Sequence, residues 1–217
     1  MQPIQAILFD MDGTLVDSER VGQKAWAATA DEMGIDIPED LVRSFIGRPS
    51  HSCRALLAEH LSGDVDLADR VFDLHIELFL RFVETDLELK PGAIEVLEAL
   101  KEAGYPLAIA TSTARVRAVP RLERFDMLKY FDSVTCGDEI ENGKPAPDIF
   151  VESARRLGFD PAVCAVIEDS HNGVRSGHAS GARVFMIPDI VAPTPEIEGM
   201  CAAVLPSLRE LLAAILG

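Results

Sequence analysis

The chain has 217 residues, of which 48% are hydrophobic and 26% are charged, the composition of a folded globular protein of one domain or one and a half. This composition excludes collagen-like, disordered and disulfide-scaffold proteins. The 36 acidic residues outnumber the 20 basic ones and give a net charge of -16, which repels phosphate backbones and anionic lipids, so we expect no nucleic-acid or membrane partner.

The first predicted element is a buried strand, the apolar run Ile4–Phe9. The interval that follows is rich in helix-forming residues from Glu19 to Glu88, and it is too long for an ordinary loop. Apolar residues recur at helical spacing near its end, at Leu67, Val71, Leu74, Leu78 and Phe82. We therefore expect an α-helical subdomain, residues 18–87, inserted into a core domain of residues 1–17 and 88–217.

From residue 91 onward, predicted strands and helices alternate. The predicted strands are Leu107–Ala110, Ser133–Cys136, Val163–Ile167, Arg183–Ile187 and a short Ala202–Leu205. The predicted helices follow Pro91-Gly92 and span Pro147–Leu157 and Ser207–Leu216. This alternation predicts an α/β fold, in which a Rossmann-like parallel sheet carries helices on both faces.

Two carboxylates follow the first predicted strand, in the motif Asp10-Met11-Asp12-Gly13-Thr14. In an open α/β sheet, ligands bind outside the carboxyl ends of the strands. Two carboxylates placed there are costly to desolvate unless they share a cation or a proton. A helix-capping aspartate before a glycine turn would explain one of these carboxylates, but it would not explain the pair.

Three further strand ends carry polar groups that suit the same site. Thr111 and Ser112 follow the second predicted strand, Lys144 lies in the loop after the third, and Glu168 and Asp169 follow the fourth. Each group alone could be a helix cap or a solvated surface residue. Together they combine hard oxygen ligands, donors for anionic charge and a carboxylate nucleophile, so we expect a Mg²⁺ site that handles a phosphoryl group.

These motifs, in this order, resemble those of the haloacid dehalogenase superfamily, in its β-phosphoglucomutase-like branch with a helical cap. The resemblance is carried by Asp10-x-Asp12-Gly13-Thr14, Thr111-Ser112, Lys144-Pro145 and Glu168-Asp169. It covers nearly the whole chain. It implies that the helical insert is a cap that closes over the active site and excludes water other than the attacking molecule.

The resemblance also implies a role for each motif residue. Asp10 is expected to be the nucleophile, which forms an aspartyl-phosphate, and Asp12 to be the general acid and base. The implied Mg²⁺ ligands are the Asp10 side chain, the Asp12 backbone carbonyl and the Asp169 side chain, with Glu168 as a further ligand or as a support for the ligands. The residues expected to bind the transferring phosphoryl group are Thr111, Ser112 and Lys144.

The function that the resemblance favours is Mg²⁺-dependent hydrolysis of a small phosphorylated metabolite, with a sugar phosphate as the expected substrate. Dehalogenases of this fold need no acid, so the presence of Asp12 favours phosphoryl transfer. A β-phosphoglucomutase-type mutase is an alternative, but Gly22 stands where a cap histidine is expected. A receiver-like signalling domain that accepts a phosphoryl group is a more remote alternative, because the helical insert has no place in it.

Two cap residues are candidates for contact with the substrate. Arg48, in Gly47-Arg48-Pro49, resembles the cap arginine that contacts the distal part of the substrate in this branch, although it could equally be a solvated loop residue. Lys24 is the sole lysine between Ser18 and Leu87, so it is the candidate for the Schiff base of a phosphonate-cleaving member.

Other notable side chains are expected to be structural. We expect Trp26, Phe45, Phe72 and Phe79 to form the core of the cap, and the histidines to have surface or packing roles. We also expect the arginines of the helix after Ser112 to form one face of that helix, with the steering of anions as a minor alternative; they are Arg115, Arg117, Arg121 and Arg124.

The start of the chain and the cysteines bear on the compartment. The opening residues lack the basic and long apolar regions of a signal peptide, and no apolar run approaches the ~20 residues of a membrane-spanning helix. Cys53, Cys136, Cys164 and Cys201 are scattered, without a Cys-x-x-Cys pair or a histidine at zinc-ligand spacing. We therefore expect a cytoplasmic protein with reduced thiols. The sequence carries no signal of its oligomeric state, for which a monomer is the default expectation.

Overall fold

The computed structural model describes residues 3–45 and 50–217, which divide into two compact units. One unit, the core, comprises residues 1–16 and 89–217, and the other, the helical unit, comprises residues 17–88. The chain thus leaves the core soon after its first strand and returns to it before the second. Arg48, expected to contact the substrate, lies outside the described residues.

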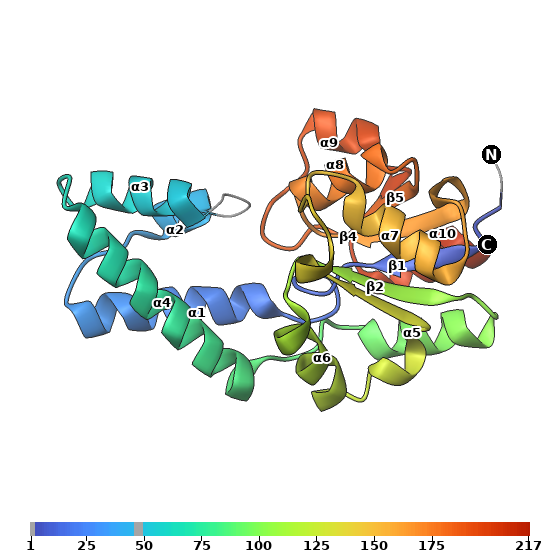
Figure 1. Cartoon of the computed structure of the whole chain (residues 1–217), viewed down its shortest axis with the longest axis horizontal. Coiled ribbons are helices and arrows are strands. Elements are labelled where there is room, and N and C mark those ends of the chain that lie inside the picture. Colours follow the sequence, from blue (N-terminus) through green and yellow to red (C-terminus); the bar gives the residue numbers. More distant parts are fainter. Residues whose placement is uncertain (1–2, 46–49) are drawn as a thin grey trace. The chain divides into compact units, whose positions relative to one another are not determined.

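Within the described residues, the core contains one sheet of six strands in the order β3-β2-β1-β4-β5-β6 (Figure 1). The strands are β1 (Ala6–Phe9), β2 (Leu107–Thr111), β3 (Ser133–Cys136), β4 (Cys164–Glu168), β5 (Arg183–Met186) and β6 (Ala203–Val204). Every neighbouring pair is parallel, and β1, β2 and β4 are buried along their whole length. The predicted parallel sheet is confirmed, with strand ends that differ from the prediction by at most two residues.

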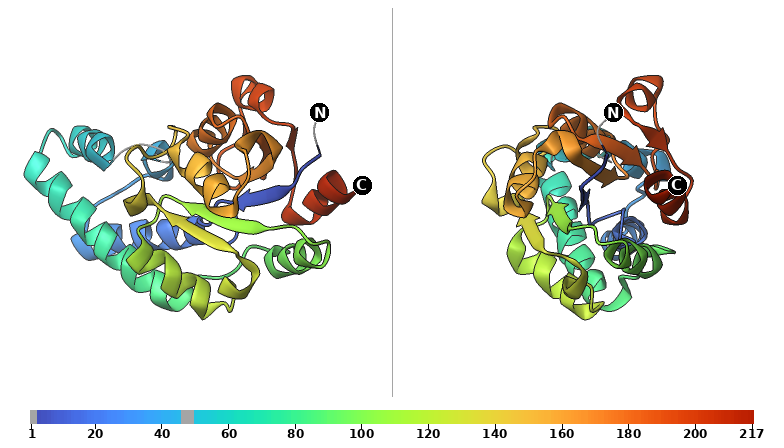
Figure 2. Two further views of the ribbon diagram at one scale, coloured as in Figure 1. Left: turned by 45° about the vertical axis from the view of Figure 1, so that its right-hand side comes forward. Right: turned by 90° about the vertical axis from the view of Figure 1, so that its right-hand side faces the viewer.

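Helices cover both faces of the sheet, as the alternation of elements predicts. Figures 1 and 2 show α7, α8 and α9 on one face and α5 and α6 on the other, while α10 packs against α5. The core helices are α5 (Ala93–Glu102), α6 (Arg115–Arg124), α7 (Asp148–Leu157), α8 (His171–Ala179), α9 (Pro195–Met200) and α10 (Leu208–Leu216). Short 3-10 helices span Leu128–Tyr130, Gly137–Glu139 and Pro161–Val163.

The register of the central strands aligns their carboxyl ends. Phe9 of β1 lies opposite Ile109 of β2 and Ile167 of β4. Because parallel strands end at the same edge of a sheet, the residues that follow β1, β2 and β4 meet at one edge. Apolar packing within the core stabilises this sheet. Leu8 of β1 and Phe150 of α7 are fully buried in one cluster, and the burial of each contributes about 1.5 to 3 kcal/mol to the free energy of unfolding.

The helical unit is built from four helices within its described residues. They are α1 (Ser18–Met33), α2 (Glu39–Phe45), α3 (Ser50–His60) and α4 (Val65–Asp86). Trp26 of α1 lies at the centre of their core, with ring centroids 5.1 Å from Phe45 and 5.9 Å from Phe72. His75 of α4 stacks on Trp26 at 3.7 Å with an interplanar angle of 9°. Trp26, Phe45 and Phe72 therefore form the expected core, whereas Phe79 is half-buried beside His75. His75 has the packing role expected of the histidines.

Lys24, the candidate for a Schiff base, has partners within its own unit. The Nζ atom of Lys24 lies 2.6 Å from Oδ2 of Asp86 and 4.6 Å from the centre of the Phe82 ring, so this ammonium is already paired within the helical unit.

Among the residues that the structure describes, we find no helix with both the length and the apolar character that crossing a bilayer requires.

Candidate active site

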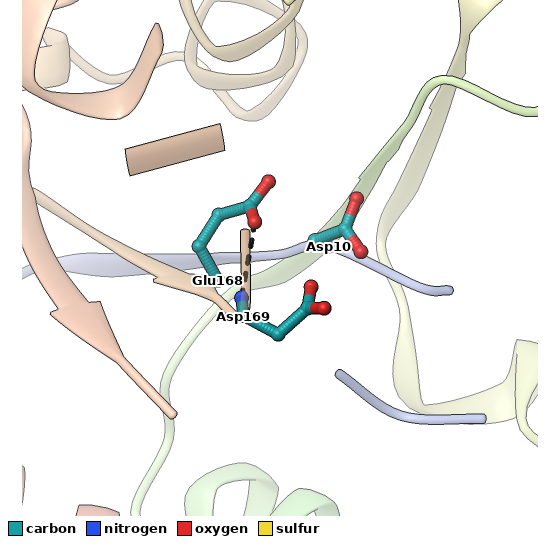
Figure 3. A group of neighbouring side chains, drawn as sticks. All are labelled: Asp10, Glu168 and Asp169. Atoms are coloured by element: carbon teal, nitrogen blue, oxygen red, sulfur yellow. Dashed lines mark hydrogen bonds between the residues drawn. The ribbon is translucent and has the colours of Figure 1, made fainter. Parts of the chain in front are cut away.

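Three buried carboxylates meet at the carboxyl edge of the sheet, and we call them the acidic trio: Asp10, Glu168 and Asp169. Each offers an oxygen, and these oxygens lie within 4.8 Å of one another. Asp10 follows β1, while Glu168 ends β4 and Asp169 follows it. Figure 3 shows the Asp10 and Asp169 carboxylates next to each other, with Glu168 beside them. The predicted convergence of the two acidic motifs is therefore present in the structure.

Lys144 is the cation of this site. Its Nζ atom lies 2.5 Å from Oδ1 of Asp10 and 2.6 Å from Oε1 of Glu168. Burial by itself would lower the pKa of Lys144, but the two carboxylates raise it above its usual value. The two carboxylates therefore favour the charged form of Lys144.

The burial of three carboxylates in one place affects the protonation of Asp10. Burial raises the pKa of Asp10 to about 8, helped by the charge of Glu168 and opposed by Lys144. Three buried carboxylates face one ammonium, so the site has an excess of negative charge. A bound divalent cation would remove this excess and favour the ionised form of Asp10. The carboxylate oxygens that converge here could hold a hard divalent cation.

Glu168 accepts hydrogen bonds from four protein donors. Besides the Lys144 bond to Oε1, its Oε2 accepts the N–H of Asp169 at 3.0 Å, the N–H of Ser170 at 3.1 Å and the Ser170 hydroxyl at 3.0 Å. Gly173 lies so close that a Cβ atom there would overlap the Glu168 carboxylate. These contacts let Glu168 orient both Lys144 and the turn that presents Asp169.

The rest of the first motif holds Asp169. Oγ1 of Thr14 donates to Oδ1 of Asp169 at 3.1 Å. Gly13 has φ +85°, which favours glycine, and a Cβ atom there would collide with the Asp169 carboxylate. Gly-Thr is therefore required next to the two aspartates because it lets β1 and β4 bring their carboxylates together.

The side chain of Asp12 lies outside the acidic trio. Its Oδ2 accepts the hydroxyl of Thr113 at 2.7 Å and, more weakly, that of Thr111 at 3.5 Å. Its Oδ1 accepts Nη1 of Arg121 at 3.0 Å. The two aspartates of one motif therefore have different surroundings: Asp10 is buried beside a lysine, and Asp12 is held by hydroxyls and a guanidinium.

The two hydroxyl residues expected to bind phosphate differ in exposure. Thr111 ends β2 and is buried, and its Oγ1 accepts the N–H of Thr113 at 3.1 Å. Ser112, the next residue, is exposed. Both stand at the same edge of the sheet as Asp10 and Lys144, because β2 is hydrogen-bonded to β1.

The expectation for the arginines of α6 is wrong for Arg121. Arg115, Arg117 and Arg124 are exposed, whereas Arg121 is only 7% exposed and pairs with Asp12. Thr113 and Thr14 belong to the predicted hydroxyl stretch and the first motif, but the sequence did not show that they donate to Asp12 and to Asp169. A signal for Arg121 existed, since it stands beside the apolar residue Leu122 and three positions after Ala118, on a face that an amphipathic helix buries.

Comparison with known proteins agrees with these motifs. A sequence model described as "Hydrolase: haloacid dehalogenase-like hydrolase" matches residues 4–181. The chain belongs to this family. The resemblance inferred from the four motifs is thus confirmed.

Two relatives of this haloacid dehalogenase-like hydrolase are named phosphatases. The chain is 37% identical over 178 residues to the phosphorylated carbohydrates phosphatase of Thermotoga maritima, which covers 82% of each chain. It is 34% identical over 210 residues to hexitol phosphatase A of Escherichia coli, which covers 95% of this chain and 93% of the relative. The protein is accordingly a phosphatase, an enzyme that hydrolyses phosphoric monoesters.

A solved structure supports the same grouping. The fold matches that of a candidate beta-phosphoglucomutase of Thermotoga maritima with a TM-score of 0.78, at 31% sequence identity and over 98% of this chain and 99% of the other. The α/β core with a helical insert is therefore shared with the branch that the motifs indicate.

Proposed function

We propose that this phosphatase hydrolyses the phosphoric monoester of a small carbohydrate, with Mg²⁺ bound beside Asp10 and with Asp10 as the nucleophile. The observation that carries the proposal is the different environment of the two aspartates. Asp10 contacts the ammonium of Lys144, and Asp12 is held by Thr113 and Arg121. Carboxylates in contrasting environments can take contrasting roles in one reaction. The names of the two relatives favour a carbohydrate as the alcohol part of the substrate.

The residues present fit Mg²⁺. The Asp10 and Asp169 side chains and the Asp12 backbone carbonyl would hold the ion, and the occupied carboxylate of Glu168 would support this arrangement. When bound, Mg²⁺ supplies charge that stabilises the phosphoryl oxygens in the transition state.

In the proposed first half-reaction, a carboxylate oxygen of Asp10 attacks phosphorus. A bond forms between this oxygen and phosphorus, and the bond between phosphorus and the ester oxygen breaks. Asp12, in its protonated form, gives its proton to the departing alkoxide. Lys144 and the Thr111 and Ser112 hydroxyls hold the phosphoryl oxygens, so negative charge that develops there meets donors already in place.

In the second half-reaction, water hydrolyses the aspartyl-phosphate. Asp12, now a carboxylate, takes a proton from the water, whose oxygen attacks phosphorus. The bond between phosphorus and the Asp10 oxygen breaks, so phosphate leaves and both aspartates return to their starting forms. The same side chain serves as acid and then as base, which requires it to reach the ester oxygen and the water at the same position.

The helical unit is proposed to select the substrate. Residues 18–87 would act as the cap and exclude bulk water during turnover, and Arg48 would contact the part of the substrate distant from the phosphoryl group. The mutase alternative would pass the phosphoryl group to a second hydroxyl instead of water. Incubation with β-glucose 1-phosphate separates the two: inorganic phosphate supports the phosphatase, and glucose 6-phosphate supports the mutase.

The sharpest test of the two aspartate roles is Asp12→Ala. Para-nitrobenzyl phosphate has an alkoxide leaving group that needs a proton, whereas para-nitrophenyl phosphate has a leaving group that departs without one. The variant should lose turnover of the benzyl ester by about 100-fold or more. With the phenyl ester it should release nitrophenol in a burst of about one per active site, because hydrolysis of the aspartyl-phosphate also needs Asp12. Equal losses on both esters without a burst would refute the assignment.

The metal is tested separately. Dialysis against EDTA should abolish turnover, and Mg²⁺ should restore it. Ca²⁺ should inhibit, because this larger ion accepts bidentate carboxylates and would occupy both oxygens of Asp10. Full turnover in excess EDTA would contradict the proposed cofactor.

A further inference from the structure

We propose that Arg121 is a positioning residue, which acts through Asp12 and holds its carboxylate in line for the proton transfers. The inference rests on the proposed function, since it assigns a partner to the proposed acid and base. It concerns a residue of α6 that lies outside the four motifs, 109 positions from Asp12 in the chain.

The two anchors of Asp12 bind different oxygens. Nη1 of Arg121 donates to Oδ1 at 3.0 Å, and Oγ1 of Thr113 donates to Oδ2 at 2.7 Å. Two donors on opposite oxygens fix the rotation of a carboxylate about its last side-chain bond, which a single donor cannot do. The Asp12 side chain is 27% exposed, so packing alone does not hold it as it holds Asp10.

The burial of Arg121 indicates that its contact with Asp12 is a fixed part of the packed core. The Arg121 side chain is 8% exposed, in contrast to the neighbouring Arg117 one turn earlier on α6. A buried guanidinium is costly unless it is paired. Arg121 lies on the buried face of α6, together with Ala118 and Leu122.

Arg121 also gives Asp12 a cation of its own, distinct from the Lys144 that pairs with Asp10 and Glu168. Lys144 serves Asp10 and Glu168, and Thr14 binds Asp169. Asp12 would otherwise be a further carboxylate competing for Lys144 or for a bound cation. Bound to Arg121 and Thr113, the Asp12 side chain is held apart from Lys144 and the acidic trio. Arg121 therefore keeps the second aspartate of the motif distinct from the first.

The experiment compares Arg121→Met with Arg117→Met, which removes the same charge from an exposed position of the same helix. Turnover of para-nitrobenzyl phosphate by Arg121→Met should fall by about 10- to 100-fold, the cost of a misplaced catalytic group, mainly in kcat and with little change in KM. The rate of the nitrophenol burst from para-nitrophenyl phosphate should fall much less. Arg117→Met should match the parent on both esters.

A second background shows whether Arg121 acts through Asp12. In Asp12→Asn, the carboxylate is absent, so adding Arg121→Met should cause no further loss with either ester. Further loss by the same factor as in the parent would overturn the inference, as would equal effects of Arg121→Met on the two esters. If Asp12→Asn itself kept full turnover, the proposed function would fail first, and the two failures are thus distinguishable.

Chemical rescue guards against a purely structural effect. Guanidinium chloride at a concentration well below that which unfolds the protein should raise the activity of Arg121→Ala several-fold and leave that of Arg117→Ala unchanged. Arg121→Lys, which keeps the charge but loses the planar fork, should retain more activity than Arg121→Met at a similar melting temperature. Failure of both guanidinium and lysine to recover activity would overturn the positioning role.

Discussion

The Nζ atom of Lys144 lies 2.5 Å from Oδ1 of Asp10, across 134 positions of sequence. The same ammonium lies 2.6 Å from Oε1 of Glu168, so one buried cation joins the ends of β1 and β4 to the loop after β3. In the proposed reaction this contact has two consequences. It holds the nucleophile in place, and it leaves a positive charge beside the phosphoryl group when the Asp10 oxygen forms its new bond.

Lys144→Met is expected to destabilise the metal-free protein and to abolish activity. Removing one partner of a buried ion pair leaves uncompensated carboxylates, which costs about 3 kcal/mol of the free energy of unfolding. Urea unfolding in EDTA measures this loss. Lys129→Met is the matched control, because Lys129 pairs with Asp126 at the surface and its removal should leave the midpoint nearly unchanged. Equal midpoints for the two variants would contradict the prediction.

The stability of the metal-free protein should fall as the pH rises through the window set by Asp10. Burial raises the pKa of Asp10 from 3.8 to about 8. Between these values the folded protein binds a proton at Asp10 that the unfolded chain has released, so the free energy of unfolding decreases with rising pH. Asp10→Asn removes this group, and its stability should fall less between pH 5 and pH 8.

Urea unfolding at both pH values, in EDTA, measures the two slopes. Asp10→Asn should also be inactive, because an amide is no carboxylate nucleophile, and rapid-quench labelling should trap a phosphoprotein in the parent alone. Parallel pH dependence of the parent and the variant would show that the Asp10 carboxyl titrates normally.

Gly173→Ala should displace the Glu168 carboxylate and thereby lower both stability and activity. The added methyl group would overlap the Glu168 carboxylate, which must then shift away from Lys144 and from the N–H of Asp169. We expect a loss of about 1 to 3 kcal/mol in the free energy of unfolding, typical of overpacking, and a fall in kcat. Gly199→Ala in α9 is the control, because a Cβ atom there meets open space. Wild-type turnover by Gly173→Ala would show that Glu168 can move without consequence.

The helical unit should lose stability in acid because of His75. Burial lowers the pKa of His75 from 6.5 to about 4, and its Nδ1 is buried without a hydrogen-bond partner among the described residues. Between these values the unfolded chain binds a proton that the folded protein does not, so the free energy of unfolding falls as the pH drops. The expected loss from pH 7 to pH 5 is about 1 to 2 kcal/mol.

Trp26 reports on this effect, since it is the single tryptophan of the chain and stacks on His75. Urea unfolding followed by its fluorescence should show a smaller acid-dependent loss in His75→Phe than in the parent. His51→Gln, at an exposed position of α3, should behave as the parent does. Equal acid sensitivity of His75→Phe and the parent would rule out His75 as the source.

The fold class and the motif residues at the carboxyl edge of the sheet could be predicted from the amino-acid sequence. Short apolar runs that end in Asp10, Thr111 and Glu168 are sufficient to predict that these residues share one edge, because parallel strands place their carboxyl ends side by side. The order of the strands could not be read in this way. That β1 lies between β2 and β4, and so brings Asp10 to Glu168, depends on which strands pair, and pairing is a property of the packed sheet.

The partner of each carboxylate could not be predicted before the chain was folded. The sequence left Glu168 as a metal ligand or a support, and its four protein donors became visible when β4, the Ser170 turn and Lys144 were assembled. Arg121 was expected to share one helix face with the other arginines of α6, because neither a helical period nor a motif shows which group a buried guanidinium contacts. The contact between α6 and the first motif joins segments distant in the chain, and only folding brings Arg121 within 3.0 Å of Asp12.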